Sequence, residues 1–403
     1  MTELDTSGTA TSTGDRSRPR AVLPALCATQ ITSWGVVYYA FPVLAPRISA
    51  DTGWSTATTA AAFSLALLVS AAAGIPIGRT LDHRGPRAVM TGGSALAVTA
   101  MLAVAAAPNL PLFMAAWTLA GVAMAATFYQ PAFAALTRWY GPAHIRALTT
   151  VTLAGGLAST VFAPLTATLA NHIGWRGTYV ALAGILAVVT IPAHALALRV
   201  PWPTAPTGPA QSLTGHDATA RTRPFLLLAA ALTLSGFAVY AVLIGLVPLL
   251  TTRGASTTTA AWALGLGGLG QTLGRTLYTT LARHTGVTAR TAALIAAGGA
   301  TTALLAVIRG PVPLLIALAM LAGMVRGNLT LLQATAITDR WGITRYARLS
   351  AILAAPVTIA GALAPFAGAA IANPLGGYPR LFLVLAIVSA VAATLAGAAR
   401  TDG

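Results

Sequence analysis

The strongest constraint on the fold of this 403-residue chain is a series of long apolar runs. A membrane-spanning helix needs about 20 mostly apolar residues, and runs of that length recur between short breaks rich in Arg, Pro or Gly. The composition agrees, since 56% of the residues are hydrophobic and 8% are charged, whereas about a quarter of the residues in a soluble globule are charged. Strands of a membrane barrel are about 10 residues long and alternate in polarity, so the run length predicts helices.

The apolar runs predict twelve spans, with ends placed to within about four residues. They cover residues 21–46, 55–78, 87–107, 110–137, 145–170, 177–198, 224–250, 256–282, 290–308, 311–338, 348–371 and 380–399. We therefore expect an all-α membrane protein with twelve transmembrane helices, located in the plasma (inner) membrane as a multi-pass protein.

The distribution of Arg between loops predicts the orientation, because cytoplasmic loops collect positive charge. With both termini on one side, that side holds seventeen Arg and the opposite loops hold five, so both termini are expected in the cytoplasm. The seventeen are Arg16, Arg18, Arg20, Arg79, Arg84, Arg87, Arg138, Arg146, Arg199, Arg221, Arg223, Arg283, Arg290, Arg340, Arg345, Arg348 and Arg400, and the five are Arg47, Arg176, Arg253, Arg309 and Arg380. The net charge of +16 is thus spread over short loops, which argues against a nucleic-acid partner.

Three features of the composition exclude classes of chemistry. The chain has no Lys, so it lacks both the P-loop Lys of an ATP-driven pump and the amine of a Schiff-base enzyme. Its single cysteine, Cys27, and its six scattered His residues offer no zinc-ligand spacing. We therefore expect no enzymatic activity, no metal and no cofactor.

An internal repeat divides the chain. A shift of 201 residues superposes Gly35 on Gly236, and a shift of 202 superposes Arg138 on Arg340. The expected segments are a disordered cytoplasmic tail (1–20), an N-terminal six-helix half (21–199), a Pro-rich cytoplasmic linker (200–223), a C-terminal six-helix half (224–399) and a C-terminal tail (400–403). Such halves are typical of transporters that rock one half against the other around a site near the bilayer midplane.

The loop after the second expected span contains Gly78, Asp82, Gly85 and Arg87. Gly78 permits close helix approach, Gly85 permits a tight turn, and Asp82 can lie at a helix N-terminus or pair with an Arg. This spacing resembles the signature loop of the major facilitator superfamily, and together with the spans and the repeat the likeness covers nearly the whole chain. The resemblance implies a gating role for these four residues, whereas the alternative is an ordinary solvated turn.

A narrower resemblance is to the monocarboxylate and oxalate carriers. The run Tyr39-Ala40-Phe41-Pro42 is similar to their first-helix motif, and Arg275 stands where they keep a substrate-binding Arg. Val43 and Gln271 stand where those porters carry Lys and Asp. These departures count against proton-coupled lactate transport.

Two arginines, Arg275 and Arg326, lie inside expected spans, while all eight acids lie in tails, loops or helix ends. Each buried Arg costs about 2.5 to 3.5 kcal/mol on insertion scales. We expect an anionic substrate to offset this cost through bidentate hydrogen bonds. The alternative is that both guanidinium groups bond helix carbonyls and cavity water.

Other residues join these arginines because they share a helix face with them or carry aromatic rings. The expected substrate-binding residues are Arg275, Arg326, Gln271, Tyr278, Gln30, Trp34, Tyr38, Phe128, Tyr240 and Gln333. For the aromatic residues, helix packing is the alternative role.

These features predict a secondary, non-ATP transporter that moves a small organic solute, an anion such as a carboxylate, by alternating access. The alternative is an efflux exporter of drugs or secondary metabolites. With no acid in any expected span, proton coupling through a buried carboxylate is excluded, whereas facilitated diffusion and anion exchange stay open. The expected partners are the solute and the lipid bilayer, and the protein is expected to function as a monomer.

Overall fold

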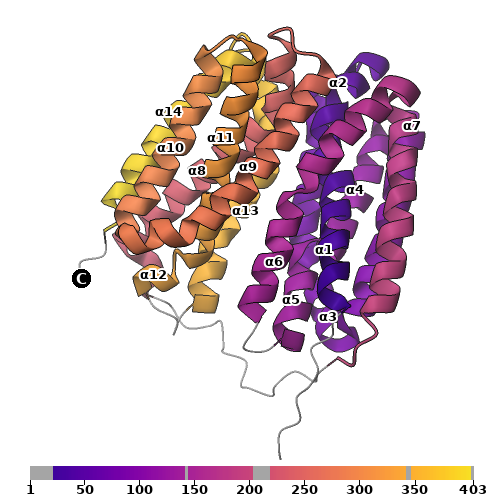
Figure 1. Cartoon of the computed structure of the whole chain (residues 1–403), viewed down its shortest axis with the longest axis horizontal. Coiled ribbons are helices and arrows are strands. Elements are labelled where there is room, and N and C mark those ends of the chain that lie inside the picture. The colour runs from indigo at the N-terminus through magenta and orange to yellow at the C-terminus, as the bar shows by residue number, and fades with distance from the viewer. Residues whose placement is uncertain (1–20, 141–143, 203–217, 342–345, 401–403) are drawn as a thin grey trace, which may run out of the picture.

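The computed structural model describes residues 21–140, 144–202, 218–341 and 346–400, apart from a few side chains within these ranges. The described residues form helices in two bundles that lie side by side, as Figure 1 shows. The expected N-terminal tail, most of the expected linker and residues 401–403 of the expected C-terminal tail lie outside the described residues.

The first bundle is built from the N-terminal part of the chain and the second from the C-terminal part. The first comprises α1 (Val22–Ser33), a π-helix η1 (Trp34–Tyr39), α2 (Ala40–Thr52), α3 (Thr56–Ala106), α4 (Leu110–Thr127), α5 (Tyr129–Tyr140), α6 (His144–Gly156) and α7 (Ala158–Ala197). The second comprises a short 3-10 helix (Ala218–Arg221), α8 (Arg223–Thr251), α9 (Thr257–His284), α10 (Val287–Val307), α11 (Val312–Thr335), α12 (Thr338–Trp341), α13 (Tyr346–Ala372) and α14 (Tyr378–Ala398).

Two of these helices are long enough to hold two spans each, and each is interrupted by a glycine. α3 has 51 residues but is interrupted at Gly85, where φ is 74°. α7 has 40 residues and is interrupted at Gly174, where φ is 66°. Glycine adopts this left-handed conformation without a Cβ clash, so each of these elements contains two helices.

The expected count of twelve spans is not confirmed by the structure. Within the described residues, nine helices are long and apolar enough to cross a membrane. The other three expected spans are not counted separately by these criteria. Residues 22–52 are divided by η1, α9 is less apolar, and the two helices that meet at Gly174 count as one candidate span, residues 146–197. The structure therefore supports an all-helical membrane fold without confirming a count of twelve.

The internal repeat has a structural counterpart in the turns that precede α3 and α9. Gly53 and Gly254 both have positive φ, at 73° and 86°. Ser55 and Ser256 then begin the next helix in the same way, since each side chain accepts a hydrogen bond from the backbone N–H three residues later, at 3.0 and 3.1 Å. Serine caps of this kind satisfy an otherwise unpaired donor at the helix start.

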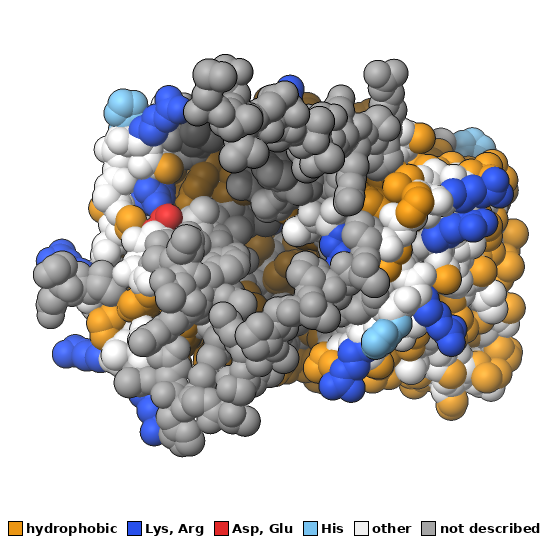
Figure 2. All heavy atoms as spheres, turned by 90° about the horizontal axis from the view of Figure 1, so that it is seen from below, with side chains coloured by type: hydrophobic (Ala, Val, Ile, Leu, Met, Phe, Trp, Pro, Cys, Tyr) orange, Lys and Arg blue, Asp and Glu red, His pale blue; other side chains and the backbone are white. Residues whose placement is uncertain are grey.

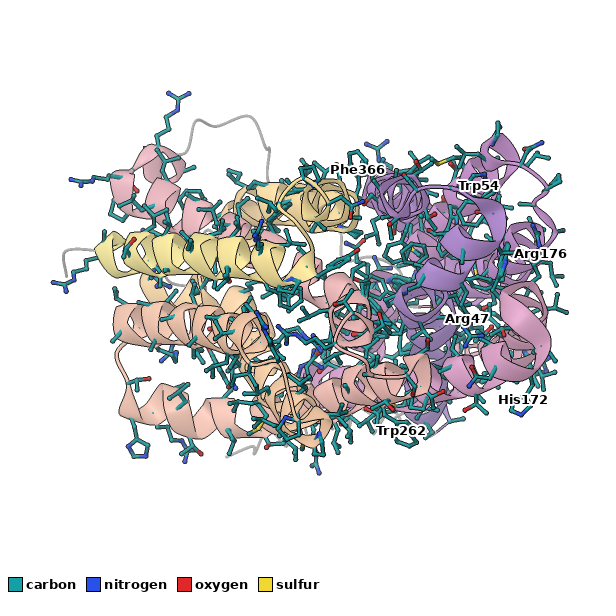
Figure 3. The ribbon with its side chains drawn as sticks, turned by 90° about the horizontal axis from the view of Figure 1, so that it is seen from above. Arg47, Trp54, His172, Arg176, Trp262 and Phe366 are labelled. Atoms are coloured by element: carbon teal, nitrogen blue, oxygen red, sulfur yellow. The ribbon has the colours of Figure 1, made fainter. Side chains whose placement is uncertain are left out.

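The two bundles contact each other along α3 with α13 and along α7 with α9. At the end of the molecule drawn uppermost in Figure 1, side-chain hydrogen bonds connect them. The Asn171 amide donates to the Thr258 hydroxyl at 2.9 Å, and the Phe366 backbone N–H donates to the Ser64 hydroxyl at 3.0 Å. Figure 3, seen from this end, shows Phe366 at the boundary between the bundles. We call this the closed end.

At the opposite end, where α1 begins and α14 ends, the bundles spread apart (Figure 1). Figure 2 shows this end with arginine side chains around its rim and apolar side chains in a hollow between the bundles. We call this the open end.

Candidate substrate cavity

A cavity lies between the two bundles, near the middle of the helices that line it. It has a larger compartment of about 520 Å³ and a smaller one of about 190 Å³. The two compartments adjoin each other, since they share five lining residues, contributed by both bundles. These are Trp34, Tyr38, Tyr129, Tyr240 and Gln333.

The smaller compartment contains both arginines that the sequence places inside the membrane. Arg275 of α9 and Arg326 of α11 line it together with Gln271. The Arg326 Nε donates to the Gln271 side-chain oxygen at 3.0 Å. No acidic residue is among the described residues of this lining, so the compartment carries positive charge.

Arg275 is only 7% exposed, and its guanidinium group crosses to the other bundle. One terminal nitrogen donates to the backbone carbonyl of Thr152 near the end of α6, where helix carbonyls are electronegative. The buried Nε of Arg275 has no hydrogen-bond partner among the described residues. A helix carbonyl thus satisfies part of this side chain, as expected for a structural role.

Glycines place the two arginine-bearing helices in direct backbone contact. A Cβ on Gly323 would overlap the carbonyl oxygen of Gly267, and a Cβ on Gly327 would overlap that of Gln271. Arg326 lies between these two glycines in sequence and therefore meets Gln271 across the contact. Small residues that allow close helix approach are common in membrane proteins, and here they bring the charged and amide groups together.

The N-terminal bundle contributes an aromatic wall. The rings of Trp34 and Phe128 are stacked, with centroids 4.1 Å apart and planes 20° apart. Trp34 also contacts Tyr129, at 5.1 Å between centroids, and Tyr38, at 5.3 Å. These four residues, which we call the aromatic wall, line the larger compartment.

A break in the fourth expected span fixes the orientation of Trp34. Pro131 has no N–H, so the carbonyl of Thr127, four residues earlier, loses its helical partner. The Gln30 amide donates to this carbonyl at 2.7 Å, and the Gln30 side-chain oxygen accepts from the Trp34 indole N–H at 3.2 Å. Gln30 therefore supports the wall from behind and is not a lining residue.

The π-helix η1 explains a residue that sequence reasoning missed. Its i→i+5 hydrogen bonds widen the turn, and Trp34, Tyr38 and Tyr39 all line the smaller compartment. An α-helical period of 3.6 residues selects Trp34 and Tyr38 and omits Tyr39. Ser235 of α8 was also missed, because an isolated Ser in an apolar helix carries no distinctive signal.

The structure brings together eight of the ten expected substrate-binding residues. The residues that line the cavity are Arg275, Arg326, Gln271, Trp34, Tyr38, Phe128, Tyr240 and Gln333. Tyr278, like Gln30, is not in the lining. Its hydroxyl lies 2.9 Å from that of Thr335, and the Arg290 guanidinium lies 5.6 Å from its ring centre.

Near Tyr278, Arg290 forms an ion pair with Asp339 at 2.6 Å. Tyr278 therefore belongs to a polar cluster within the C-terminal bundle, away from the cavity. Its position three residues after Arg275 predicted a shared face, but the side chain packs toward α10 and α11.

The expected gating loop is described in part. Gly85 makes the tight turn that its sequence predicted, and a Cβ there would also lie 3.1 Å from Trp202. The Arg87 Nε donates to the carbonyl of Ala195 in the same bundle at 2.9 Å. The close helix packing expected at Gly78 is not seen among the described residues, because a Cβ there would meet none of their atoms within 4 Å. The side chain of Asp82 lies outside the described part of the structure.

Comparison with known proteins agrees with the helical membrane fold. A family model described as Major Facilitator Superfamily matches residues 26–311. Monocarboxylate transporter 13 of Bos taurus is 32% identical over 205 residues, which cover 50% of this chain and 47% of that protein. The protein of the same name from Rattus norvegicus is 31% identical over 208 residues, with the same two coverages. The chain thus spans about half the length of the curated relatives it matches.

A solved structure gives a likeness over nearly the whole chain. It is a bacterial homolog of the human lysosomal transporter Spinster, in an inward-facing and occupied conformation. The TM-score is 0.75 at 15% identity, over 96% of this chain and 97% of that one. At this identity the likeness shows the fold alone, whereas the family model matches most of the sequence. The chain belongs to the Major Facilitator Superfamily of membrane transporters.

Proposed function

We propose that this protein moves a small organic anion, such as a carboxylate, across the membrane by alternating access without ATP. The observation that carries the proposal is the pair Arg275 and Arg326 in the cavity between the bundles, with no acidic residue in its described lining. A guanidinium group presents parallel donors that match a carboxylate. The anion would supply the negative charge that the membrane region lacks.

The electrostatics favour this reading over export of cationic drugs. A buried positive charge attracts an anion and repels a cation more strongly in a low-dielectric cavity than in water. The name of the two curated relatives points in the same direction for those proteins, and we extend it here as a proposal.

For the topology we propose twelve spans in two six-helix halves, at residues 21–199 and 224–399, with both termini in the cytoplasm and the carrier acting as a monomer in the plasma membrane. The open end then faces the cytoplasm. In this arrangement Gly78, Asp82, Gly85 and Arg87 lie at the open end and act in closing it.

The decisive experiment is counterflow in proteoliposomes with labelled carboxylates and cationic drugs. Arg275→Gln removes the charge, and we expect it to lower carboxylate transport about 10- to 150-fold, since hydrogen bonds to charged groups contribute about 1.5 to 3 kcal/mol. The matched control is Arg309→Gln, because Arg309 is an exposed loop arginine and its loss should leave transport within about twofold.

Full carboxylate transport by folded Arg275→Gln protein would refute the proposal. Accumulation of cationic drugs at the same rate in the wild type and in this variant would support the exporter alternative instead.

A further inference from the structure

The two compartments of the cavity differ in chemistry as well as in size. The described lining of the larger compartment contains no charged side chain. Its polar groups are those of Ser70, Gln130, Gln333 and Thr358, together with the Tyr hydroxyls, and the rest of its lining is apolar or aromatic. The positive charge of the described lining lies in the smaller compartment. A ligand that fills both compartments therefore needs a negative charge at one end and an apolar body at the other.

The size of the larger compartment favours a ligand bigger than a two- or three-carbon acid. The larger compartment, at about 520 Å³, lies within the range of about 300 to 1,000 Å³ that is typical of small-molecule sites. A two- or three-carbon acid held by Arg275 and Arg326 would leave most of this space to water against apolar walls. An apolar body attached to the carboxylate would displace that water favourably.

The shape of the wall indicates what this body is. Trp34 and Phe128 form a stacked pair, and Gln30 fixes the Trp34 ring by hydrogen bonds of 3.2 Å to its indole and 2.7 Å to the Thr127 carbonyl. A wall held in place before the ligand arrives loses little entropy on binding. Flat aromatic surfaces of this kind pack well against another aromatic ring.

We infer that the substrate is an aryl carboxylate, with its carboxylate at Arg275 and Arg326 and its ring against the Trp34–Phe128 wall. This inference rests on the proposed function and adds the class of substrate to it. The ligand then contacts both bundles at once, because the rings belong to the N-terminal bundle and the guanidinium groups to the C-terminal one.

The test uses the full-length carrier in proteoliposomes, with affinities measured by competition in counterflow. The probes are phenylacetate and indole-3-acetate, with acetate and lactate as small acids and phenylacetamide as the uncharged match. We expect phenylacetate to bind at least about 30-fold more tightly than acetate, since burying a phenyl-sized group is worth this much. Phenylacetamide should bind at least about tenfold more weakly than phenylacetate.

Variants assign this selectivity to the wall. Phe128→Ala should weaken phenylacetate binding about three- to tenfold and leave acetate within twofold. Phe128→Leu keeps much of the volume without the ring, so it tests the wall if the alanine variant is poorly folded. The matched control is Phe366→Ala, because Phe366 is exposed at the closed end and does not line the cavity.

The outcomes separate this inference from the proposed function. If acetate and lactate bind as tightly as the aryl acids and still require Arg275, the aryl inference fails and the carboxylate function stands. If no carboxylate is bound or carried by folded protein, both fail. If both Phe128 variants weaken acetate and phenylacetate equally, the ring has a structural role and the inference is overturned.

Discussion

The two bundles share the internal sequence repeat but line the cavity with different kinds of side chain. The N-terminal bundle supplies stacked rings, and the C-terminal bundle supplies two guanidinium groups and an amide. By the shifts of the internal repeat, the counterparts of Arg275 and Arg326 in the first half are Gly74 and Met124. The turns outside the cavity stayed alike, as Gly53 and Gly254 with their positive φ values illustrate.

This difference indicates that duplication preserved the frame and that the cavity diverged. Turns and caps must hold in both halves because each half folds by the same local rules, whereas only one half needs to hold the charge of the ligand. Under the proposed function, with the rings on one bundle and the charge on the other, a bound anion would bridge the two bundles. Binding would then be coupled to the motion between the bundles through the ligand itself.

We expect the largest effect at the backbone contact between α9 and α11, the two helices that carry Arg275 and Arg326. Gly323→Val would force a side chain into the Gly267 carbonyl, and overpacking typically costs about 1 to 3 kcal/mol. Because the contact is backbone to backbone, we expect a loss at the top of this range and little folded carrier. Size-exclusion chromatography and thermal melting in detergent measure it.

The matched control is Gly184→Ala, since a Cβ at Gly184 meets no atom within 4 Å. It should raise stability by up to about 1 kcal/mol through helix propensity. Equal behaviour of the two variants would contradict backbone contact between α9 and α11.

The next effect concerns the charge itself. Arg326→Gln should lower the affinity for carboxylates about 100-fold, and Arg326→Lys should restore only part of it, because Lys lacks the planar fork. Gln271→Ala removes the acceptor of the Arg326 Nε and should cost about tenfold. Competition in counterflow measures these affinities. If the Arg326→Gln variant binds carboxylates as tightly as the wild type, Arg275 alone holds the carboxylate.

A smaller effect is expected from the support of the aromatic wall. Gln30→Ala frees the Trp34 indole and leaves the Thr127 carbonyl unpaired, so the wall loses its fixed orientation. We expect phenylacetate affinity to fall about three- to tenfold while acetate affinity changes little. The control is Thr32→Ala, because the Thr32 hydroxyl donates to the Ala28 carbonyl of its own helix. A parallel loss for both acids would show that Gln30 acts through general stability.

The smallest effect is expected at the contact between the bundles. Thr258→Val removes the acceptor of the Asn171 amide, and one such hydrogen bond is worth about 1 kcal/mol. The population with the closed end open should therefore rise about fivefold. Spin labels at the exposed positions Ala50 and Arg309 would measure this as a longer distance.

A control for the spin-label measurement is Thr99→Val, because the hydroxyl of Thr99 bonds the Ala95 carbonyl in its own helix. The labelled protein needs Cys27→Ser, since Cys27 is the chain's own cysteine. An unchanged distance distribution in the Thr258 variant would mean that the Asn171 contact does not hold the closed end.

The sequence alone predicted the helical membrane fold and eight of the residues that line the cavity. Apolar run length identifies helices because the bilayer fixes the length of a span. Arg275 and Arg326 can be identified as candidate site residues without a structure, because a charged side chain inside the bilayer is costly and usually marks a functional site. Gly85 is likewise predictable, since a turn with positive φ favours glycine.

Other features depended on contacts between residues far apart in the chain. Gln30 lies on the same helical face as Trp34, yet it faces Thr127 and not the cavity, because Pro131 leaves that carbonyl unpaired. Tyr39 enters the lining because η1 departs from the α-helical period, and Tyr278 leaves it because it packs against Thr335. Periodicity assigns a residue to a face of its own helix but does not identify what that face meets.

The sequence by itself determined that this chain crosses the membrane as helices in two related halves, because hydrophobic length, turn glycines and buried charge act locally. Only the tertiary structure decided that rings and guanidinium groups meet across a two-compartment cavity. That meeting depends on backbone contacts at Gly323 and Gly327 and on hydrogen bonds between distant helices. Such contacts form when the helices pack, and no single segment specifies them.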